Sequence, residues 1–355
     1  MWKRILTAAA ACSADTALAS NELSIENGAI GATIDLTTGC AVSAMWAVGD
    51  AAKTNLINTF DLGRYVQASF YSGPANYEGC VWSGQAWSWN PIAAGDTYGN
   101  KSPVLSSSST NTSITCTIIP MQWACNNIPC ECTVEITYAL DGNAMRANVT
   151  LNNARSDNTD YGLFSQEIPA VYVNGFLDRL VGYTGEQPCG DPRDSASLTA
   201  WDAGWDDGAG WPWVPGHLQV TEPWLAFLQE SNDFGVGVYT GAPEASSGGG
   251  SLFHFDAGFA GTKGVGGSND SPTGYMAPIG TVDLPGDGQW SYGFSLVLGD
   301  VADIRAKVCE IWRAEVQQRL RQQQQQQQQN GTEAALSRKA FSFVNADGVT
   351  EHAVV

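Results

Sequence analysis

Apolar and polar residues alternate along most of the chain, which is typical of β-strands that bury one face. Between Leu23 and Trp46 the alternation is interrupted by Asn27-Gly28, a pair that favours a tight hairpin turn. Similar stretches separated by turn residues occur at 65–71, 113–119, 132–140, 144–151, 225–228, 235–239 and 290–298. Because no helical period of 10–15 residues lies between these stretches, the sequence predicts an all-β fold, a large antiparallel sandwich of two sheets.

One helix is predicted near the C-terminus, where apolar residues recur at three- and four-residue spacing: Val301, Ile304, Val308 and Ile311. Asp300 precedes them as an N-cap. We expect this helix to pack on the sheet edge. The glutamine tract 322–329 and the polar tail after it offer no apolar stripe, so we expect this segment to be mobile or to extend the helix, without a catalytic role.

The composition limits the class of protein. Apolar residues make up 43% of the chain, which excludes overall disorder, while 39 glycines, 13 tryptophans and only 15% charged residues argue against a helical bundle. The net charge of −19 repels phosphate backbones and anionic lipid, so we expect no nucleic-acid partner. No apolar run is long enough to span a membrane, so we expect a soluble chain with no membrane partner.

The first nineteen residues have the features of a secretory signal peptide. Lys3 and Arg4 precede a short apolar run, and Ala17-Leu18-Ala19 places small residues where a signal peptidase reads the chain. The alternative is a frayed cytosolic N-terminus. The predicted organisation is a signal peptide at 1–19, a β-sandwich domain at 20–312, and a helix extension with the glutamine tract and a disordered tail at 313–355.

Removal of 1–19 leaves eight cysteines, an even number that favours disulfides in an extracellular protein. Cys125, Cys130 and Cys132 lack the two short-spaced ligand pairs of a structural zinc site, and no histidine lies near them, so we favour disulfides over zinc or free thiols. Five sequons in polar sequence also predict a secreted glycoprotein: Asn100, Asn111, Asn148, Asn269 and Asn330.

Aromatic and polar residues concentrate at 63–96, 165–172 and 201–213. Flat rings beside carboxylates and amides suit a sugar, whose C–H faces pack on rings while its hydroxyls find polar partners. The alternative is that the tryptophans only close the ends of the sandwich. The candidate sugar-binding residues are Arg64, Gln67, Trp87, Trp89, Asn90, Asp96, Trp201, Trp205 and His217.

Glu167 is the preferred catalytic carboxylate, because it lies in an apolar strand-like stretch where burial raises a carboxyl pKa. Its alternative is a structural salt bridge with Arg64, Arg155 or Arg179. His254 is the second candidate for proton transfer, and its alternative is a hydrogen-bonded core or rim histidine. Glycoside hydrolysis needs a second carboxylate, for which the sequence offers Asp96, Asp202, Asp206 and Glu222.

No cofactor is predicted. Asp202, Asp206 and Asp207 are candidate calcium ligands, but their spacing does not match the twelve-residue calcium loop, so a solvated acidic loop is the default interpretation. The chain contains no nucleophile elbow, phosphate loop, dinucleotide fingerprint or His-Glu-x-x-His motif.

The opening hairpin from Asn27-Gly28 through 36–42, followed by 55–58 and Gly63-Arg64, resembles the start of a galactose-mutarotase-like β-supersandwich. The resemblance covers residues 22–300 in strand pattern and the first 75 in motif detail. It implies sugar binding on a concave sheet face, as in aldose epimerases, polysaccharide lyases and domains of glycoside hydrolases. The histidine and late glutamate of true aldose epimerases have no counterpart, which argues against mutarotase activity.

We therefore expect a secreted, disulfide-bonded protein that acts on a polysaccharide or oligosaccharide by hydrolysis or β-elimination. Hydrolysis requires paired carboxylates, whereas β-elimination requires a base and a cation that neutralises a uronate, for which Arg64 or Arg179 are candidates. The other hypotheses are a non-catalytic carbohydrate-binding module and a structural extracellular glycoprotein.

Overall fold

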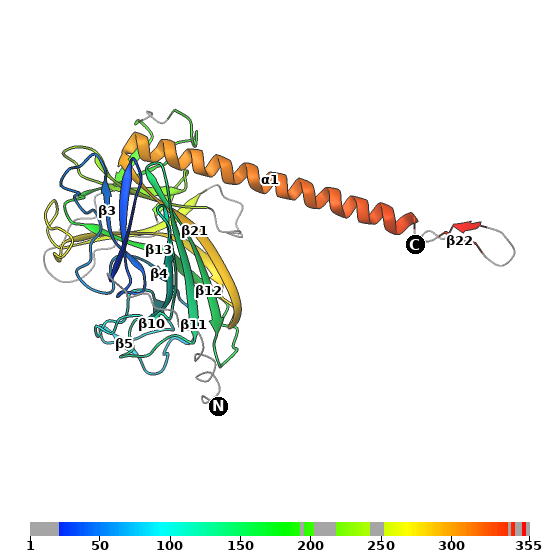
Figure 1. The fold of residues 1–355 in the computed structure, drawn as a ribbon, viewed down its shortest axis with the longest axis horizontal. Coiled ribbons are helices and arrows are strands. Elements are labelled where there is room, and N and C mark those ends of the chain that lie inside the picture. Colours follow the sequence, from blue (N-terminus) through cyan, green and yellow to red (C-terminus); the bar gives the residue numbers. More distant parts are fainter. Residues whose placement is uncertain are drawn as a thin grey trace.

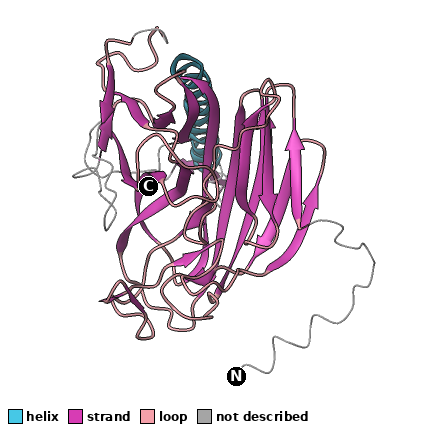
Figure 2. Cartoon of the chain, turned by 90° about the vertical axis from the view of Figure 1, so that its left-hand side faces the viewer, coloured by secondary structure: helices cyan, strands magenta, loops and turns pink. Residues whose placement is uncertain are grey.

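Two large antiparallel β-sheets pack face to face, with one long helix after them, so the predicted all-β two-sheet sandwich with a C-terminal helix is confirmed (Figures 1 and 2). The structure is a computed structural model and describes residues 21–191, 195–201, 218–241, 252–339, 342–344 and 350–352. From residue 328 onward it describes the backbone alone.

The first sheet has ten strands and carries the N-terminal hairpin. In spatial order its main path is β1 (Glu22–Glu26), β2 (Ile30–Asp35), β3 (Ala41–Ala47), β4 (Val66–Ser69), β13 (Leu163–Asn174), β20 (Thr273–Asp283), β19 (Phe253–Ala260) and β16 (Leu218–Val220). Two short strands lie off this path: β7 (Pro91–Ile92) pairs with β4, and β10 (Met121–Gln122) pairs with β7. The predicted turn at Asn27-Gly28 joins β1 to β2, where Glu26 pairs with Gly31.

The second sheet has nine strands. In order they are β15 (Leu198–Trp201), β14 (Arg179–Tyr183), β17 (Trp224–Leu228), β18 (Phe234–Thr240), β21 (Asp287–Asp300), β12 (Ala144–Ala154), β11 (Cys132–Asp141), β9 (Ser113–Ile118) and β8 (Val104–Ser109). Two small hairpins complete the described strands: β5 (Val81–Trp82) with β6 (Gln85–Ala86), and β22 (Ser342–Val344) with β23 (Thr350–His352).

The pattern of alternation did not predict β20, although this strand lies inside the first sheet, between β13 and β19. It contains Gly274, Pro278 and Gly280, which weaken a strand pattern. Gly274 is required by packing, because a Cβ there would lie 2.7 Å from the ring of Phe227 in the opposite sheet. The residue that obscures the strand in the sequence thus lets the two sheets approach.

Apolar side chains from the two sheets meet in one core. Cys40, immediately before β3, is disulfide-bonded across this core to Cys116 on β9. The other three disulfides are Cys80–Cys125, Cys130–Cys132 and Cys189–Cys309, so all eight predicted cysteines are paired and the zinc alternative is wrong.

Helix α1 (Val301–Lys339) begins at the predicted N-cap, where the Asp303 amide donates to the Asp300 side chain at 2.8 Å. Its buried residues Ile304, Val308 and Ile311 pack on the outward face of the nine-stranded sheet. The expected position at the sheet edge is therefore wrong. The face needs a cover because its outward positions are apolar, namely Val181, Trp224, Ala226, Tyr239 and Val297.

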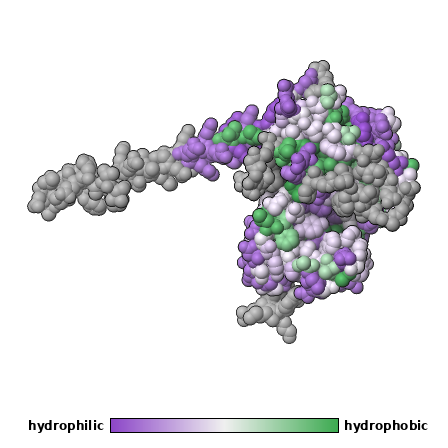
Figure 3. Space-filling view, turned by 180° about the vertical axis from the view of Figure 1, so that it is seen from behind, coloured by the Kyte–Doolittle hydropathy of each residue, from purple (hydrophilic) through white to green (hydrophobic). Residues whose placement is uncertain are grey.

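The rest of α1 continues through the glutamine tract and projects away from the sandwich (Figure 1). Its described side chains beyond Trp312 are mostly exposed and hydrophilic (Figure 3). The expected helix extension is therefore present through the glutamine tract as far as Lys339. No helix in the described part of the chain combines the length and apolarity needed to cross a membrane.

A buried ion pair joins the helix to the sheet beneath it. Arg305 of α1 and Glu222, which precedes β17, are 1% and 0% exposed, and their charged groups lie 2.8 Å apart. The carboxylate also accepts hydrogen bonds from the Trp224 indole at 2.7 Å and the Cys189 amide at 2.6 Å. Cys189 is disulfide-bonded to Cys309 on the same helix, so a covalent and an ionic link lie side by side.

Replacing Glu222 by Gln should leave the Arg305 guanidinium buried without a counter-charge. We expect a loss of about 3–5 kcal/mol in the free energy of unfolding, measured by urea denaturation with the disulfides intact. Glu230→Gln, at the exposed pair with Lys263, is the matched control and should change the unfolding free energy little. Equal effects of the two substitutions would contradict a stabilising role for the buried pair.

Candidate functional site

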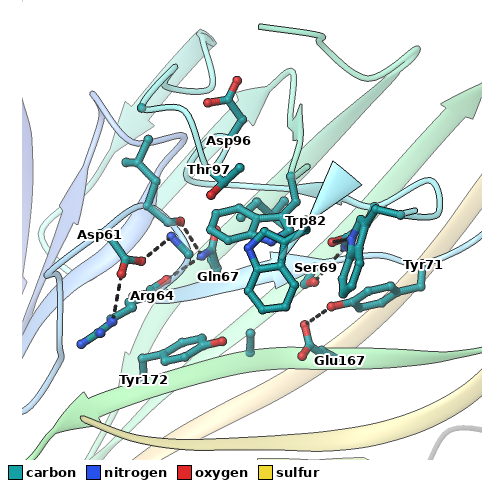
Figure 4. A pocket seen from close by; sticks show the side chains of 18 residues that line it. Asp61, Arg64, Gln67, Ser69, Tyr71, Trp82, Asp96, Thr97, Glu167 and Tyr172 are labelled. Carbon is teal, nitrogen blue, oxygen red and sulfur yellow. Dashed lines mark hydrogen bonds and ion pairs between the residues drawn. The ribbon is translucent and has the colours of Figure 1, made fainter. Parts of the chain in front are cut away.

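A pocket of about 570 Å³ lies on the outward face of the ten-stranded sheet (Figure 4). Val66 of β4 and Val171 of β13 point into the core, whereas Gln67 of β4 and Tyr172 of β13 line the pocket. The alternation of side chains along each strand therefore separates core from pocket floor. The same two strands also contribute Ser69, Glu167 and Ala170. The rest of the lining comes from Tyr71, from segments 61–64 and 82–99, and from Trp123.

A β-bulge in β13 turns Glu167 toward this pocket. On β4, Ser69 and Gln67 are two residues apart, yet their partners on β13, Glu167 and Ala170, are three apart. The additional residue in β13 places Glu167 on the same face as Ala170. In a regular strand Glu167 would point into the core with Val171.

Two tyrosine hydroxyls donate hydrogen bonds to the Glu167 carboxylate, Tyr71 at 3.2 Å and Tyr275 at 2.5 Å. Tyr71 is itself fixed by the buried Gln166, whose side chain bonds both the amide and the carbonyl of Tyr71 at 2.8 Å. Figure 4 shows Glu167 on the pocket floor beside Tyr71.

Glu167 does not form the structural salt bridge that was considered as its alternative role. Each of the three arginines considered for it pairs with an aspartate instead. These ion pairs are Arg64–Asp61, Arg155–Asp157 and Arg179–Asp233.

The pKa of Glu167 is raised, and burial is the main cause because it disfavours the charged carboxylate. The hydrogen bonds from Tyr275, Ser69 and Tyr71 oppose this shift, and the negative charge of Asp256 adds to it. Burial and the Glu167 charge also hold the pKa values of the tyrosines well above their ordinary range, so these hydroxyls remain proton donors in hydrogen bonds. The site thus holds a carboxyl group that remains protonated at higher pH than a solvated one.

Three tryptophans form the wall above this floor. The ring centroid of Trp82 lies 5.1 Å from that of Trp87 and 6.3 Å from that of Trp123. Gly63 permits this packing, because a Cβ at Gly63 would lie 2.6 Å from the Trp123 ring. The disulfide Cys80–Cys125 joins the backbones that carry the rings. We call Trp82, Trp87 and Trp123 the tryptophan wall.

Gln67 and Asn90 line the pocket as the sequence predicts, and both side chains also hold the surrounding backbone. The Gln67 amide bonds the carbonyl of Leu62 at 3.0 Å and the amide of Ala94 at 2.7 Å. Asn90 accepts the Trp87 indole N–H at 3.1 Å and donates to a backbone carbonyl of the adjacent segment at 2.8 Å. Asn90 therefore orients one ring of the tryptophan wall.

Asp96 also lines the pocket, but its carboxylate organises a loop. It accepts hydrogen bonds from the amides of Tyr98, Asn100 and Asn127 at 2.7–2.9 Å, and from the Asn100 side chain at 2.8 Å. With Asp96 only 1% exposed, these bonds occupy the carboxylate that the sequence offered to a sugar or to catalysis.

Arg64 lies at one end of the pocket, beside Asp61 (Figure 4). Its Nε is 3.2 Å from the Asp61 carboxylate, and Nη1 donates to the Asn58 side chain at 3.0 Å and to the Ser271 carbonyl at 2.7 Å. The side chain is 7% exposed.

Other sequence candidates lie away from the pocket. Trp89 is 1% exposed in the core, and Trp201 lies on the edge strand β15 of the other sheet, so neither reaches the pocket, contrary to expectation. Glu222 forms the buried ion pair with Arg305, so it is not the second carboxylate of the pocket. Trp205, His217, Asp202, Asp206 and Asp207 lie outside the described residues, as do residues 1–19.

His254 is on the outward face of β19, since its neighbour Phe255 is in the core. Glu167 pairs with Ile279 of β20, and the β19–β20 register continues from Phe255↔Pro278 to place His254 beside Ile279. His254 and Glu167 thus share a face two strands apart, roughly 10 Å between Cα atoms. His254 does not line the pocket.

Tyr71, Trp82 and Tyr172 lie in the aromatic segments that the sequence pointed to, although none was named as a candidate. Sequence reasoning missed Asp61 and Trp123, which line the pocket, and Tyr275 and Asp256, which act on Glu167 from outside the lining. Tyr275 and Asp256 come from β20 and β19, which follow Glu167 by about a hundred residues in the chain. Their approach depends on strand order, for which a single sequence carries no signal.

One cluster of potential metal ligands occurs in the described residues, formed by Cys189, Glu222 and Cys309. The two cysteines are disulfide-bonded and Glu222 pairs with Arg305, so these groups are not available to a metal.

No protein-family model and no curated protein matches this sequence. Solved structures with a related arrangement include a galactose mutarotase-like protein from Lactobacillus casei, with 14% identity and a TM-score of 0.45 over 78% of this chain and 100% of that chain. Another is a putative aldose 1-epimerase from Escherichia coli, with 9% identity and a TM-score of 0.44 over 79% and 99%.

A third is a 4-α-glucanotransferase from Thermococcus litoralis, with 8% identity and a TM-score of 0.40 over 78% and 37%. The structural neighbours thus include galactose mutarotase-like proteins, in agreement with the resemblance seen in the sequence. The identities are low and the similarity concerns the arrangement of the chain, so the function is inferred from the pocket itself.

Glu167→Gln should stabilise the fold at alkaline pH. Because the folded pKa of Glu167 is raised, its contribution to stability is complete below the unfolded pKa and is lost as the pH rises through the folded pKa. The thermal midpoint of the Gln variant should exceed that of the wild type at pH 8, and the difference should shrink toward pH 4. Glu135→Gln on the exposed face of β11 is the matched control, and a lower midpoint for Glu167→Gln at pH 8 would contradict the assigned burial.

The Cys80–Cys125 disulfide should hold the tryptophan wall rather than the sandwich. A Cys80→Ser/Cys125→Ser variant should show at least about tenfold faster amide hydrogen exchange over residues 77–90, with exchange in β11 and β12 unchanged. Cys189→Ser/Cys309→Ser is the control that should not alter exchange in 77–90. The same rate in all three proteins would mean that the rings are held by packing alone.

Proposed function

We propose that the pocket binds a carbohydrate and that Glu167 transfers a proton to or from it. The observation that carries this proposal is a wall of three indole rings opposite a carboxyl group of raised pKa. Indole faces pack on the C–H surface of a pyranose ring, and a carboxyl group opposite them lies within reach of the sugar oxygens.

The chemistry that this arrangement supports best is cleavage of a glycosidic bond. In hydrolysis, the protonated Glu167 gives its proton to the leaving oxygen as the bond to the anomeric carbon breaks. Water adds to the anomeric carbon and releases a proton to a second carboxylate. Asp256 is our candidate for that carboxylate, because it lies on the same sheet face and its charge acts on Glu167.

His254 is a further proposed proton-transfer residue, for a substrate long enough to extend across β20 from Glu167. β-Elimination at Glu167 is the alternative reaction, with a uronate as substrate. A non-catalytic module remains the second candidate, favoured by the internal hydrogen bonds of Gln67, Asn90 and Asp96, which make the pocket a rigid platform.

We further propose that the protein is secreted. Four disulfides in the described residues suit an oxidising compartment. The sequon residues Asn111, Asn148 and Asn269 are exposed, as glycosylation requires, whereas the Asn100 amide donates to Asp96 and Asn126.

The test is incubation of the full-length protein with a panel of polysaccharides, with reducing ends and the absorbance of unsaturated uronates as readouts. Reducing ends without that absorbance indicate hydrolysis, and both together indicate β-elimination. Glu167→Gln should lower kcat by about 10²–10⁴-fold while retaining binding, because one proton-transfer group is lost.

Activity of the wild type should fall as the pH rises through the raised pKa of Glu167, since a general acid must be protonated. Binding without turnover would support the non-catalytic carbohydrate-binding module instead of the enzyme. Absence of binding to every glycan would overturn the proposal. Glu135→Gln serves again as the control that should retain full activity.

A further inference from the structure

The charge around the pocket bears on which glycans it admits. Among the described residues that line it, the acidic ones are Asp61, Asp96 and Glu167, and the basic one is Arg64. The chain as a whole has a net charge of −19. A negatively charged pocket repels carboxylate and sulfate groups unless a cation is positioned to contact them.

Arg64 is already neutralised. Its guanidinium contacts the Asp61 carboxylate through Nε, and Nη1 is directed to the Asn58 side chain and a backbone carbonyl. The face of the group lies over the Phe60 ring, 4.8 Å from its centroid. In Figure 4 the guanidinium lies at the end of the pocket beyond Asp61, on the side away from Trp82 and Glu167.

Arg179, the other cation considered for a uronate, lies on β14 of the opposite sheet and forms an ion pair with Asp233. It does not line the pocket. A uronate on the floor would therefore meet the Glu167 carboxyl group and the half-buried Tyr71 and Tyr172, without a counter-charge of its own. Transfer of an ionised carboxylate into such surroundings is costly.

On the basis of the proposed function, we infer that the pocket binds uncharged sugar residues and rejects uronates and sulfated sugars. Asp61 is the specificity-determining residue, because its negative charge neutralises the positive charge of Arg64. This selects hydrolysis over β-elimination, since elimination needs the carboxylate that the pocket excludes. The indole wall and the protonated form of Glu167 both suit a neutral ring.

The test compares a uronate polymer with its carboxyl-reduced derivative, which has the same linkages without the charge. Affinities of the full-length protein for both are measured by calorimetry at low and high salt. The neutral derivative should bind at least about tenfold more tightly at low salt, and the difference should narrow as salt screens the repulsion.

Asp61→Asn should expose the Arg64 charge and reduce this preference by about fivefold or more. Asp157→Asn is the matched control, because Asp157 pairs in the same way with the buried Arg155, which does not line the pocket. It should leave the preference unchanged.

Tighter binding of the charged polymer by the wild type would overturn the inference and leave the proposed function standing. Binding of neither polymer, nor of any neutral glycan in the panel, would overturn both. A wild-type preference that Asp61→Asn and Asp157→Asn alter equally would overturn the assignment to Asp61.

Discussion

The additional residue in β13 is the constraint on which the site depends. It changes the face on which Glu167 emerges, because side chains of a strand alternate and a shift of one position moves every following residue to the other side. Glu167 then reaches the outward face of a sheet whose neighbouring strands contribute Ser69 and Tyr275. The tyrosines, the raised pKa and the floor of the pocket all follow from that placement.

Two partly or fully buried carboxylates in this chain show how surroundings determine the role of a glutamate. Glu222 lies 2.8 Å from the Arg305 guanidinium, and this ion pair joins the helix to the sheet. Burial, together with the charge of Asp256, favours the neutral form of Glu167, and the hydrogen bonds from the tyrosine hydroxyls oppose this shift without reversing it. The first arrangement gains stability from a fixed charge, while the second sacrifices some stability at high pH and retains a group that can exchange a proton.

The polar groups at the pocket divide into those that build it and those that face a ligand. Gln67, Asn90 and Asp96 were predicted to hold a sugar, yet their amides and carboxylate bond the chain itself. Such internal bonds hold the backbone around the pocket and the Trp87 ring in place before a ligand binds, which lowers the entropy cost of binding. The disulfide Cys80–Cys125 contributes in the same way to the tryptophan wall.

Local chemistry sufficed to predict the sandwich, the Asn27-Gly28 hairpin and the capped helix at Asp300, because alternation, turn residues and side-chain caps act over a few neighbouring positions. The even number of cysteines predicted disulfides, but which cysteines pair was decided by the fold. The apolar context of Glu167 was also visible in the chain. Strand order and register instead decide three other features. They determine the bulge that turns Glu167 toward the pocket, the approach of Tyr71 and Tyr275 to one carboxyl group, and the burial of Trp89. These are decided by the packing of distant segments, so they exist only in the folded protein.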